Sequence, residues 1–187
     1  MYIPHKELII GGQRSGKTNR AEHLAAQWLQ QSPNNQAVYL ATAQAHDEEM
    51  HARIAYHRQE RALRVPSMQT VESTDLTTHL QTHSRPDTAI VLDCLTLWLT
   101  QMYFPWQGAA ATVDDIRARI NAFLDTLAAC QAQVYIVSNE IGLGLVAPQP
   151  ETRAFVDALG LLNQQVAALC NHATFMAAGL PLPLKRP

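Results

Sequence analysis

The stretch from Gly11 to Thr18 reads GGQRSGKT and matches the pattern GxxxxGK[ST] without a mismatch. It follows an apolar run, ELIIGG, that is typical of a strand. It precedes a stretch with apolar residues at helical spacing, namely Ala21, Leu24, Ala25, Trp28 and Leu29. Glycines permit backbone angles that a Cβ would block, so successive N–H groups can wrap around phosphates. A strand, this loop and a helix in this order predict a P-loop that binds a nucleoside triphosphate.

Each residue type in the loop has a role in that chemistry. Lys17 is predicted to reach the outer phosphates and to serve catalysis, and the Thr18 hydroxyl is predicted to ligate Mg²⁺. Asp93, which ends the apolar run AIVLD, is the predicted acid partner of the metal. An alternative role, capping the next helix, is open and compatible with the first. The predicted phosphate-binding residues are Gly11, Gly12, Gln13, Arg14, Ser15, Gly16, Lys17 and Thr18.

The rest of the chain alternates short apolar runs with helical patterns. Strands are predicted at AVYLAT, AIVLDC, QVYIVSNE and ATFMAAG, and RVPSMQTVES reads as an edge strand because Pro66 is tolerated there. Helices are predicted at residues 46–61 and in TDLTTHLQTH, TLWLTQMYF, VDDIRARINAFLDTLAACQ and ETRAFVDALGLLNQQVAALCN. This alternation predicts an α/β fold of the P-loop NTPase type, a mostly parallel sheet with helices on both faces. We expect one domain, residues 1–187, whose tail at 180–187 either adds a short edge strand or stays loose.

Composition limits the partners of the chain. A length of 187 residues suits one domain, and a net charge of −2 does not provide the basic surface that nucleic acid requires. The most apolar run, AIVLDCLTLWL, is short and carries an aspartate, so no membrane span is expected, and no signal peptide is expected either. Cys94, Cys130 and Cys170 are too dispersed for a zinc site or a disulfide framework. These features predict a cytoplasmic protein.

The segment at residues 46–61, HDEEMHARIAYHRQER, is rich in histidine and arginine. On a helix His57 shares one face with Met50, Ile54 and Arg61. A histidine on such a face is more often a packed core residue than a nucleophile, so its position leaves both alternatives open. Its neighbours favour the chemical role, because guanidinium groups around an imidazole suit a site that handles phosphates. These neighbours are Arg53, Arg58 and Arg61.

Several stretches, taken together and in order, resemble one enzyme family. They are GGQRSGKTNRAE, VYLATAQAHDEEMHARIAYHRQER, VLDCLTLWLT, VSNEIGLGLV and FVDALGLLNQ. They resemble the bifunctional adenosylcobinamide kinase / adenosylcobinamide-phosphate guanylyltransferase of cobalamin biosynthesis, from about Leu8 to the tail. The resemblance implies that a nucleoside triphosphate, ATP or GTP, phosphorylates the aminopropanol hydroxyl of adenosylcobinamide. It implies that GTP then transfers GMP to adenosylcobinamide phosphate through a GMP–histidine intermediate, giving adenosylcobinamide-GDP and pyrophosphate, and that the enzyme is a homotrimer.

The resemblance also implies roles for individual residues. His57 follows ARIAY where the family carries its intermediate histidine, and Tyr56 stands where many relatives carry a second histidine. A neutral imidazole is nucleophilic near pH 7 without a strong base. Glu72 matches an acid that helps to hold the nucleotide, although an exposed acid at the end of a strand explains it equally well. The remaining nucleotide contacts that the resemblance implies are Thr42, Ala43, Gln44, Arg58, Gln59, Glu60, Arg61 and Asp93.

Some features depart from the family or stay without a role. Val156 replaces the second arginine of an R-x-F-R-D pattern, which leaves Arg153 alone, and RQER replaces a turn that usually contains glycine. Asn139 and Glu140 close a strand at the expected ligand edge of the sheet, where they are expected to position substrate or nucleotide.

Two other functions are open from the residues alone. A P-loop small-molecule kinase without guanylyltransferase activity predicts phosphate transfer from ATP and no covalent nucleotide. A non-catalytic nucleotide switch or nucleic-acid-binding module would need a basic stripe, which the dispersed lysines and arginines do not supply.

Overall fold

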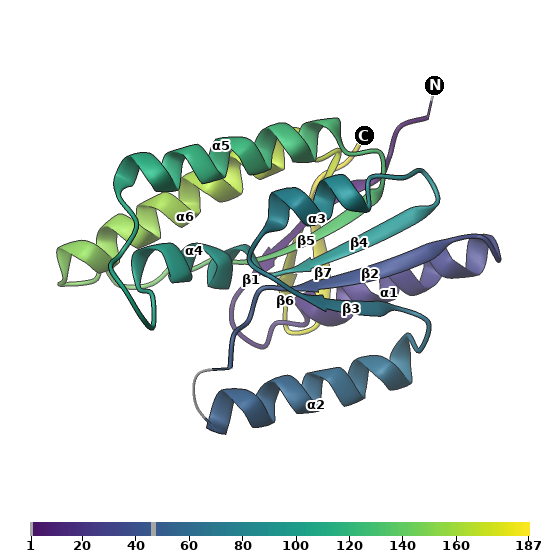
Figure 1. Cartoon of the computed structure of the whole chain (residues 1–187), viewed down its shortest axis with the longest axis horizontal. Coiled ribbons are helices and arrows are strands. Elements are labelled where there is room, and N and C mark those ends of the chain that lie inside the picture. The colour runs from purple at the N-terminus through teal and green to yellow at the C-terminus, as the bar shows by residue number, and fades with distance from the viewer. Residues whose placement is uncertain (1, 46–47) are drawn as a thin grey trace.

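The computed structural model describes residues 2–45 and 48–187, except for the side chains of Glu49, Met50, Arg53 and His57 (Figure 1). The described chain forms one sheet with the strand order β3-β2-β4-β5-β1-β6-β7. Strands β1 to β6 are parallel, and β7 is antiparallel to β6 at one edge. The strands are β1 (Lys6–Gly11), β2 (Gln36–Ala41), β3 (Gln69–Glu72), β4 (Thr88–Asp93), β5 (Gln133–Asn139), β6 (His172–Ala177) and β7 (Leu180–Lys185).

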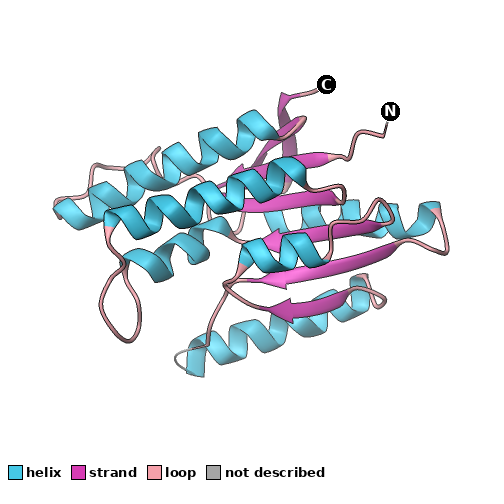
Figure 2. Cartoon of the chain, turned by 45° about the horizontal axis from the view of Figure 1, so that its top comes forward, coloured by secondary structure: helices cyan, strands magenta, loops and turns pink. Residues whose placement is uncertain are grey.

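Helices lie on both faces of this sheet, which confirms the predicted fold class (Figure 2). One face is covered by α3 (Leu76–Thr82), α4 (Leu95–Tyr103), α5 (Val113–Ala129) and α6 (Pro150–Leu169). The other face carries α1 (Lys17–Gln31), and α2 (Glu48–Arg64) lies near α1 at the β3 edge.

Alternate residues of the central strands supply two separate cores. In β5, Val134 and Ile136 pack beneath the helices α3 to α6, whereas Tyr135 and Val137 pack against α1. Successive side chains of a strand point to opposite faces, so a strand that is covered on both sides must be apolar at nearly every position. This is why the strands read as continuous apolar runs in the sequence.

Several helix ends are held by specific side chains. The start of α5 is a capping box, in which Thr112 Oγ1 accepts from the backbone N–H of Asp115 at 3.1 Å and the Asp115 carboxylate accepts from the backbone of Thr112. At the other end of α5, the buried Lys6 Nζ donates to the carbonyl of Leu127 at 2.6 Å. Lys185 of β7 binds the last carbonyls of α6 in the same way. Strands at the centre and edge of the sheet thus fix the helices that cover it.

The predicted helices and strands are present, and the structure gives more exact bounds for three of them. The histidine-rich helix starts at Glu48 in the described part, since residues 46–47 lie outside it. The predicted edge strand is β3, and Pro66 lies in the turn before it. The tail forms β7 at Leu180–Lys185.

Three further observations concern membrane-spanning helices, the cysteines and groups of metal-binding side chains. No helix of the described residues has the length and apolar character needed to cross a membrane. All three cysteines are buried as free thiols. No three histidine, cysteine or acidic side chains within the described ranges are grouped so that they could hold a metal ion.

Candidate functional site

The P-loop connects β1 to α1 and closes over the carboxyl end of the sheet. Gly11 and Gly16 have positive φ values of 153° and 99°, which side chains with a Cβ rarely adopt. A Cβ on Gly11 would stand 2.3 Å from the backbone oxygen of Met176 in β6. The loop is also tied to the β6–β7 turn, where the N–H of Gly179 donates to the carbonyl of Ser15 at 3.0 Å. The glycines therefore allow both the turn of the loop and its contact with β6.

The polar groups of the loop are arranged for a ligand with negative charge. Lys17 is buried, and its Nζ donates to the carbonyls of Gly11 and Gly12 at 3.0 and 2.6 Å. Burial lowers the pKa of Lys17, and the nearby Asp93 carboxylate opposes that shift. Ser15 Oγ is buried without a hydrogen-bond partner in the described part of the chain. The N-terminus of α1 has no side-chain cap, so its first N–H groups can bind phosphate.

Asp93 lies at the carboxyl end of β4, opposite the start of α1. Its Oδ2 accepts hydrogen bonds from Thr18 Oγ1 at 2.8 Å and from the Tyr39 hydroxyl at 2.5 Å. The N-cap residue of α4 is Cys94, so the alternative prediction that Asp93 caps the next helix is wrong. A threonine hydroxyl beside a carboxylate at a P-loop is a donor set that fits Mg²⁺, which prefers oxygen ligands and retains waters.

A pocket of about 460 Å³ lies between α2 and the carboxyl ends of β2 and β3. It brings together five residues that the resemblance selects for nucleotide contact, namely Thr42, Ala43, Gln44, Arg58 and Glu72. Arg58 and Glu72 form an ion pair across the pocket, from α2 to β3. Glu72 is thus an exposed acid at the end of β3 that is paired with Arg58 at the pocket, and its contact with nucleotide stays a prediction.

Thr42 also lines the pocket, but its polar atoms are engaged elsewhere. Its hydroxyl donates to the carbonyl of Cys94 and accepts from the N–H of Cys94, both at 2.8 Å. Its own carbonyl accepts from Gln101 of α4 at 2.7 Å. Thr42 therefore fixes the end of β2 to α4, and a direct contact with nucleotide stays a prediction.

The other α2 residues implied by the resemblance do not line the pocket. Arg61 is buried with its guanidinium carbon 3.6 Å from the centre of the Tyr39 ring, and its Nε donates to Thr70 Oγ1. Glu60 pairs with Arg64 at 3.4 Å, and Gln59 is exposed. In this arrangement only Arg58 of the four lines the pocket.

Sequence reasoning missed a buried ionic contact between α1 and α2. Arg64 of α2 donates to the carboxylate of Glu22 at 2.8 Å. Glu22 lies on α1, one helical turn after Thr18. Glu22 is 1% exposed, and its second oxygen has no hydrogen-bond partner among the residues described. Burial raises the pKa of Glu22, and the Arg64 guanidinium opposes the shift. A glutamate among the apolar positions of α1 was the available signal.

The end of β5 lies beside the P-loop strand. Asn139 pairs in register with Gly11, and the N–H of Glu140 donates to the carbonyl of Gly11 at 3.1 Å. Thr96 and Asn163 bind the backbone of Asn139 from the opposite side. The two residues thus lie at the predicted ligand edge. Arg153, by contrast, donates to two carbonyls of the loop before α6, those of Ala147 and Pro148.

The predicted nucleophile is placed only by its position on α2. Its side chain lies outside the described residues, so the structure does not test the role of His57. Ile54, on the same stripe of α2, lines the pocket, and Arg61, one turn after position 57, stacks on Tyr39. Position 57 therefore lies on the helix face that is turned toward the end of the sheet bearing Asp93.

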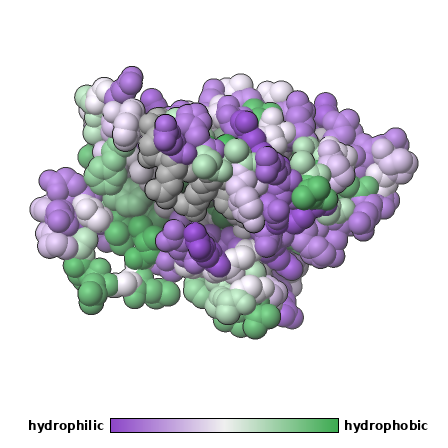
Figure 3. Space-filling view, turned by 90° about the horizontal axis from the view of Figure 1, so that it is seen from below, coloured by the Kyte–Doolittle hydropathy of each residue, from purple (hydrophilic) through white to green (hydrophobic). Residues whose placement is uncertain are grey.

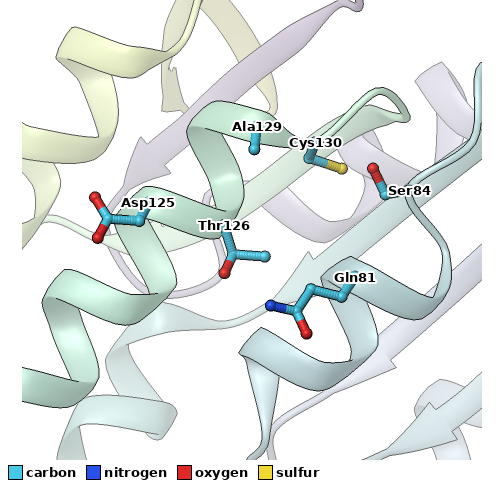
Figure 4. Close-up of a pocket in the computed structure, with 6 residues that line it drawn as sticks. All are labelled: Gln81, Ser84, Asp125, Thr126, Ala129 and Cys130. Atoms are coloured by element: carbon cyan, nitrogen blue, oxygen red, sulfur yellow. The ribbon is translucent and has the colours of Figure 1, made fainter.

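A second cavity, of about 410 Å³, lies far from these residues (Figure 4). It is formed between α3 and α5, and its lining residues directly precede the starts of β4 and β5. It therefore lies at the amino edge of the sheet, opposite the P-loop, and includes none of the predicted site residues.

The model of the family "Cobinamide kinase / cobinamide phosphate guanyltransferase" matches residues 7–184. The chain belongs to this family. It is 39% identical over 184 residues to the bifunctional adenosylcobalamin biosynthesis protein CobP of Pseudomonas aeruginosa, covering 96% of this chain and 97% of that protein. It is 32% identical to the CobU protein of the same description from Escherichia coli, covering 95% and 98%.

The cobinamide kinase family assignment agrees with the fold seen in a more distant structure. The flagellar accessory protein FlaH from Methanocaldococcus jannaschii superposes with a TM-score of 0.51 at 16% identity, over 98% of this chain and 80% of that one. At this identity the likeness concerns the fold alone. The family assignment identifies a bifunctional enzyme, a cobinamide kinase and cobinamide phosphate guanyltransferase.

Proposed function

We propose that the chain catalyses both reactions of its family at the carboxyl edge of the sheet. It phosphorylates the aminopropanol hydroxyl of adenosylcobinamide with a nucleoside triphosphate, and it then transfers GMP from GTP to adenosylcobinamide phosphate. The observation that carries this proposal is the P-loop itself, with Thr18 hydrogen-bonded to Asp93 at 2.8 Å in a chain of this family. The contact between the loop threonine and the acid at the end of β4 supports placing the nucleotide at this edge.

In the first reaction the chain acts mainly by positioning and electrostatics. The loop N–H groups and the N-terminus of α1 bind the phosphates, and Lys17 exchanges its two carbonyl partners for phosphate oxygens. Mg²⁺ held by Thr18 and Asp93 would neutralise charge that develops on the transferred phosphoryl group. The substrate hydroxyl has to approach along this edge.

In the second reaction the proposed nucleophile is His57. Its imidazole attacks the α-phosphorus of GTP, the P–O bond to pyrophosphate breaks, and a phosphoramidate forms. The phosphate of adenosylcobinamide phosphate then attacks the same phosphorus and releases the imidazole. The position of residue 57 on the same stripe of α2 as Ile54, which lines the pocket, supports this assignment.

The pocket between α2 and β3 is the proposed site for the base and sugar of the guanine nucleotide. Glu72 supplies a carboxylate acceptor there, and Arg58 supplies donors. We also propose that the enzyme works in the cytoplasm as a homotrimer, as the resemblance implies.

Apolar side chains gather at the end of the molecule seen at the left of Figure 3, over the loops at residues 104–112 and 140–149. The exposed apolar residues of these loops include Phe104, Trp106, Leu143, Leu145 and Val146. The second loop begins directly after Asn139, at the ligand edge. We place the large corrinoid substrate against this surface, because exposed apolar patches commonly mark binding sites.

One labelling experiment tests the transferase half. The protein is incubated with Mg²⁺ and GTP labelled at the α-phosphate, without corrinoid, and is denatured at alkaline pH. We expect acid-labile label on the wild type and on His23→Ala, a control at an exposed histidine of α1 outside the pocket, and none on His57→Ala. Label on His57→Ala would remove the nucleophile assignment. No label on the wild type, with kinase activity intact, would leave the chain a kinase alone.

A further inference from the structure

We propose that Tyr39 is a positioning residue for Asp93, holding that carboxylate in the orientation that the cation at the P-loop requires. The inference rests on the proposed function, in which Thr18 and Asp93 hold Mg²⁺. Neither the P-loop pattern nor the family resemblance selects Tyr39. Its assignment comes from contacts that the register of the sheet creates.

The register explains how a residue in the middle of β2 reaches the end of β4. Tyr39 pairs with Val91 of β4, and Ala41 pairs with Asp93. The ring lies on the α1 face of the sheet, in the core that also contains Ala21 and Val91. From there the hydroxyl reaches Asp93 Oδ2 at 2.5 Å, a distance typical of a hydrogen bond to a charged acceptor.

The two oxygens of Asp93 therefore differ. Oδ2 accepts from both Thr18 and Tyr39, at 2.8 and 2.5 Å. Oδ1 has no donor among the described residues, and Asp93 as a whole is only half-buried. Two donors on one oxygen prevent the carboxylate from rotating, so Oδ1 is the atom left to accept from the cation's water shell.

The ring of Tyr39 is itself held. It is 4% exposed, and the buried guanidinium of Arg61 lies over its face at 3.6 Å. Arg61 is held in turn by Thr70 of β3. A cation over an aromatic face is attractive, more so when water is excluded. Arg61 belongs to α2, the helix that carries His57. The packing of α2 against Tyr39 is therefore coupled to the orientation of Asp93.

A simpler role is possible for any buried tyrosine, whose hydroxyl needs a partner wherever it lies. The two roles differ in what they predict for cation binding. A hydroxyl that serves stability alone affects unfolding, whereas a hydroxyl that orients Asp93 affects the affinity for the cation.

The test compares Tyr39→Phe with Tyr135→Phe. Tyr135 is also 4% exposed and on the same face of the sheet, but it makes no hydrogen bond to Asp93. Mn²⁺ is the probe, and its binding in the presence of GTP is followed by electron paramagnetic resonance. Binding of a fluorescent GTP analogue in EDTA reports the nucleotide without the cation, and circular dichroism reports folding.

For Tyr39→Phe we expect Mn²⁺ affinity to fall by about 10- to 100-fold, the effect of losing a partner of a metal-binding group. Nucleotide binding in EDTA stays within about twofold, and Tyr135→Phe leaves both properties unchanged. Unchanged Mn²⁺ affinity in Tyr39→Phe, or an equal loss of binding in EDTA, overturns the inference while the proposed function stands. A wild type that binds GTP but no Mn²⁺ overturns both.

Discussion

Replacing Gly11 with alanine should destabilise the protein, independently of any effect on nucleotide binding. The new Cβ would lie 2.3 Å from the backbone oxygen of Met176 and 2.9 Å from Ser15 Oγ, at a φ of 153°. Met176 belongs to the neighbouring strand, so β1 and β6 would have to separate by about 1 Å to reach an ordinary contact distance. Overpacking and an unfavourable φ together cost about 2–5 kcal/mol.

For a chain of this length each kcal/mol lowers the melting temperature by about 2–4 °C, so Gly11→Ala should melt about 5–15 °C lower. The matched control is Gly12→Ala, because a Cβ on Gly12 meets no heavy atom within 4 Å. It should melt within about 2 °C of the wild type. Thermal unfolding is followed by circular dichroism without nucleotide, so that loss of a ligand does not contribute. Equal melting temperatures for the two variants would refute the reasoning.

Three further predictions concern charged side chains around the site. Lys17→Met should weaken binding of a fluorescent triphosphate by about 10- to 100-fold, since a charge-assisted hydrogen bond is lost, with little change in melting temperature. Burial holds the pKa of Glu22 above its unfolded value, so the folded state binds more protons and the wild type loses stability as pH rises through that window. Glu22→Gln should therefore gain stability relative to the wild type between acid and neutral pH in urea titrations, and a constant difference between the two would contradict this. Arg58→Ala should change the free energy of unfolding by less than about 1 kcal/mol, because its pair with Glu72 is exposed. It should nevertheless raise the GTP concentration that gives half-maximal labelling in the assay described above.

The parts of the site that depend on adjacent residues could be predicted from the sequence. The P-loop and the acid that ends AIVLD were predicted from residue types at fixed spacing, and the structure brings Thr18 and Asp93 within hydrogen-bonding distance. Such features depend on a few adjacent residues and on the rule that parallel strands end at one edge. The nucleotide roles of Gln44 and Glu72, two residues that line the pocket, are implied by the resemblance instead.

Contacts between side chains that are distant in the sequence could not be predicted, because they depend on the order and register of the strands. Nothing in AVYLAT indicates that its tyrosine reaches the strand that ends in Asp93. The pairing of Tyr39 with Val91 makes that contact possible, and no local pattern encodes it. Thr42 is a similar case, since its hydroxyl is hydrogen-bonded to the backbone of Cys94, the N-cap residue of α4. A polar residue in an apolar run shows that a partner exists, but not which one.

The place of β1 in the sheet has a consequence for how the protein is made. This strand leads into the P-loop, and it leaves the ribosome well before its two neighbours in the sheet, β5 at Gln133–Asn139 and β6 at His172–Ala177. The loop also contacts the turn at Gly179. Pairings so distant in sequence form late, after the long intervening chain has been ordered. A nascent chain that stops before His172 would carry the whole GGQRSGKT sequence without the strand that lies against Gly11, so nucleotide binding during synthesis should begin only after β6 has emerged.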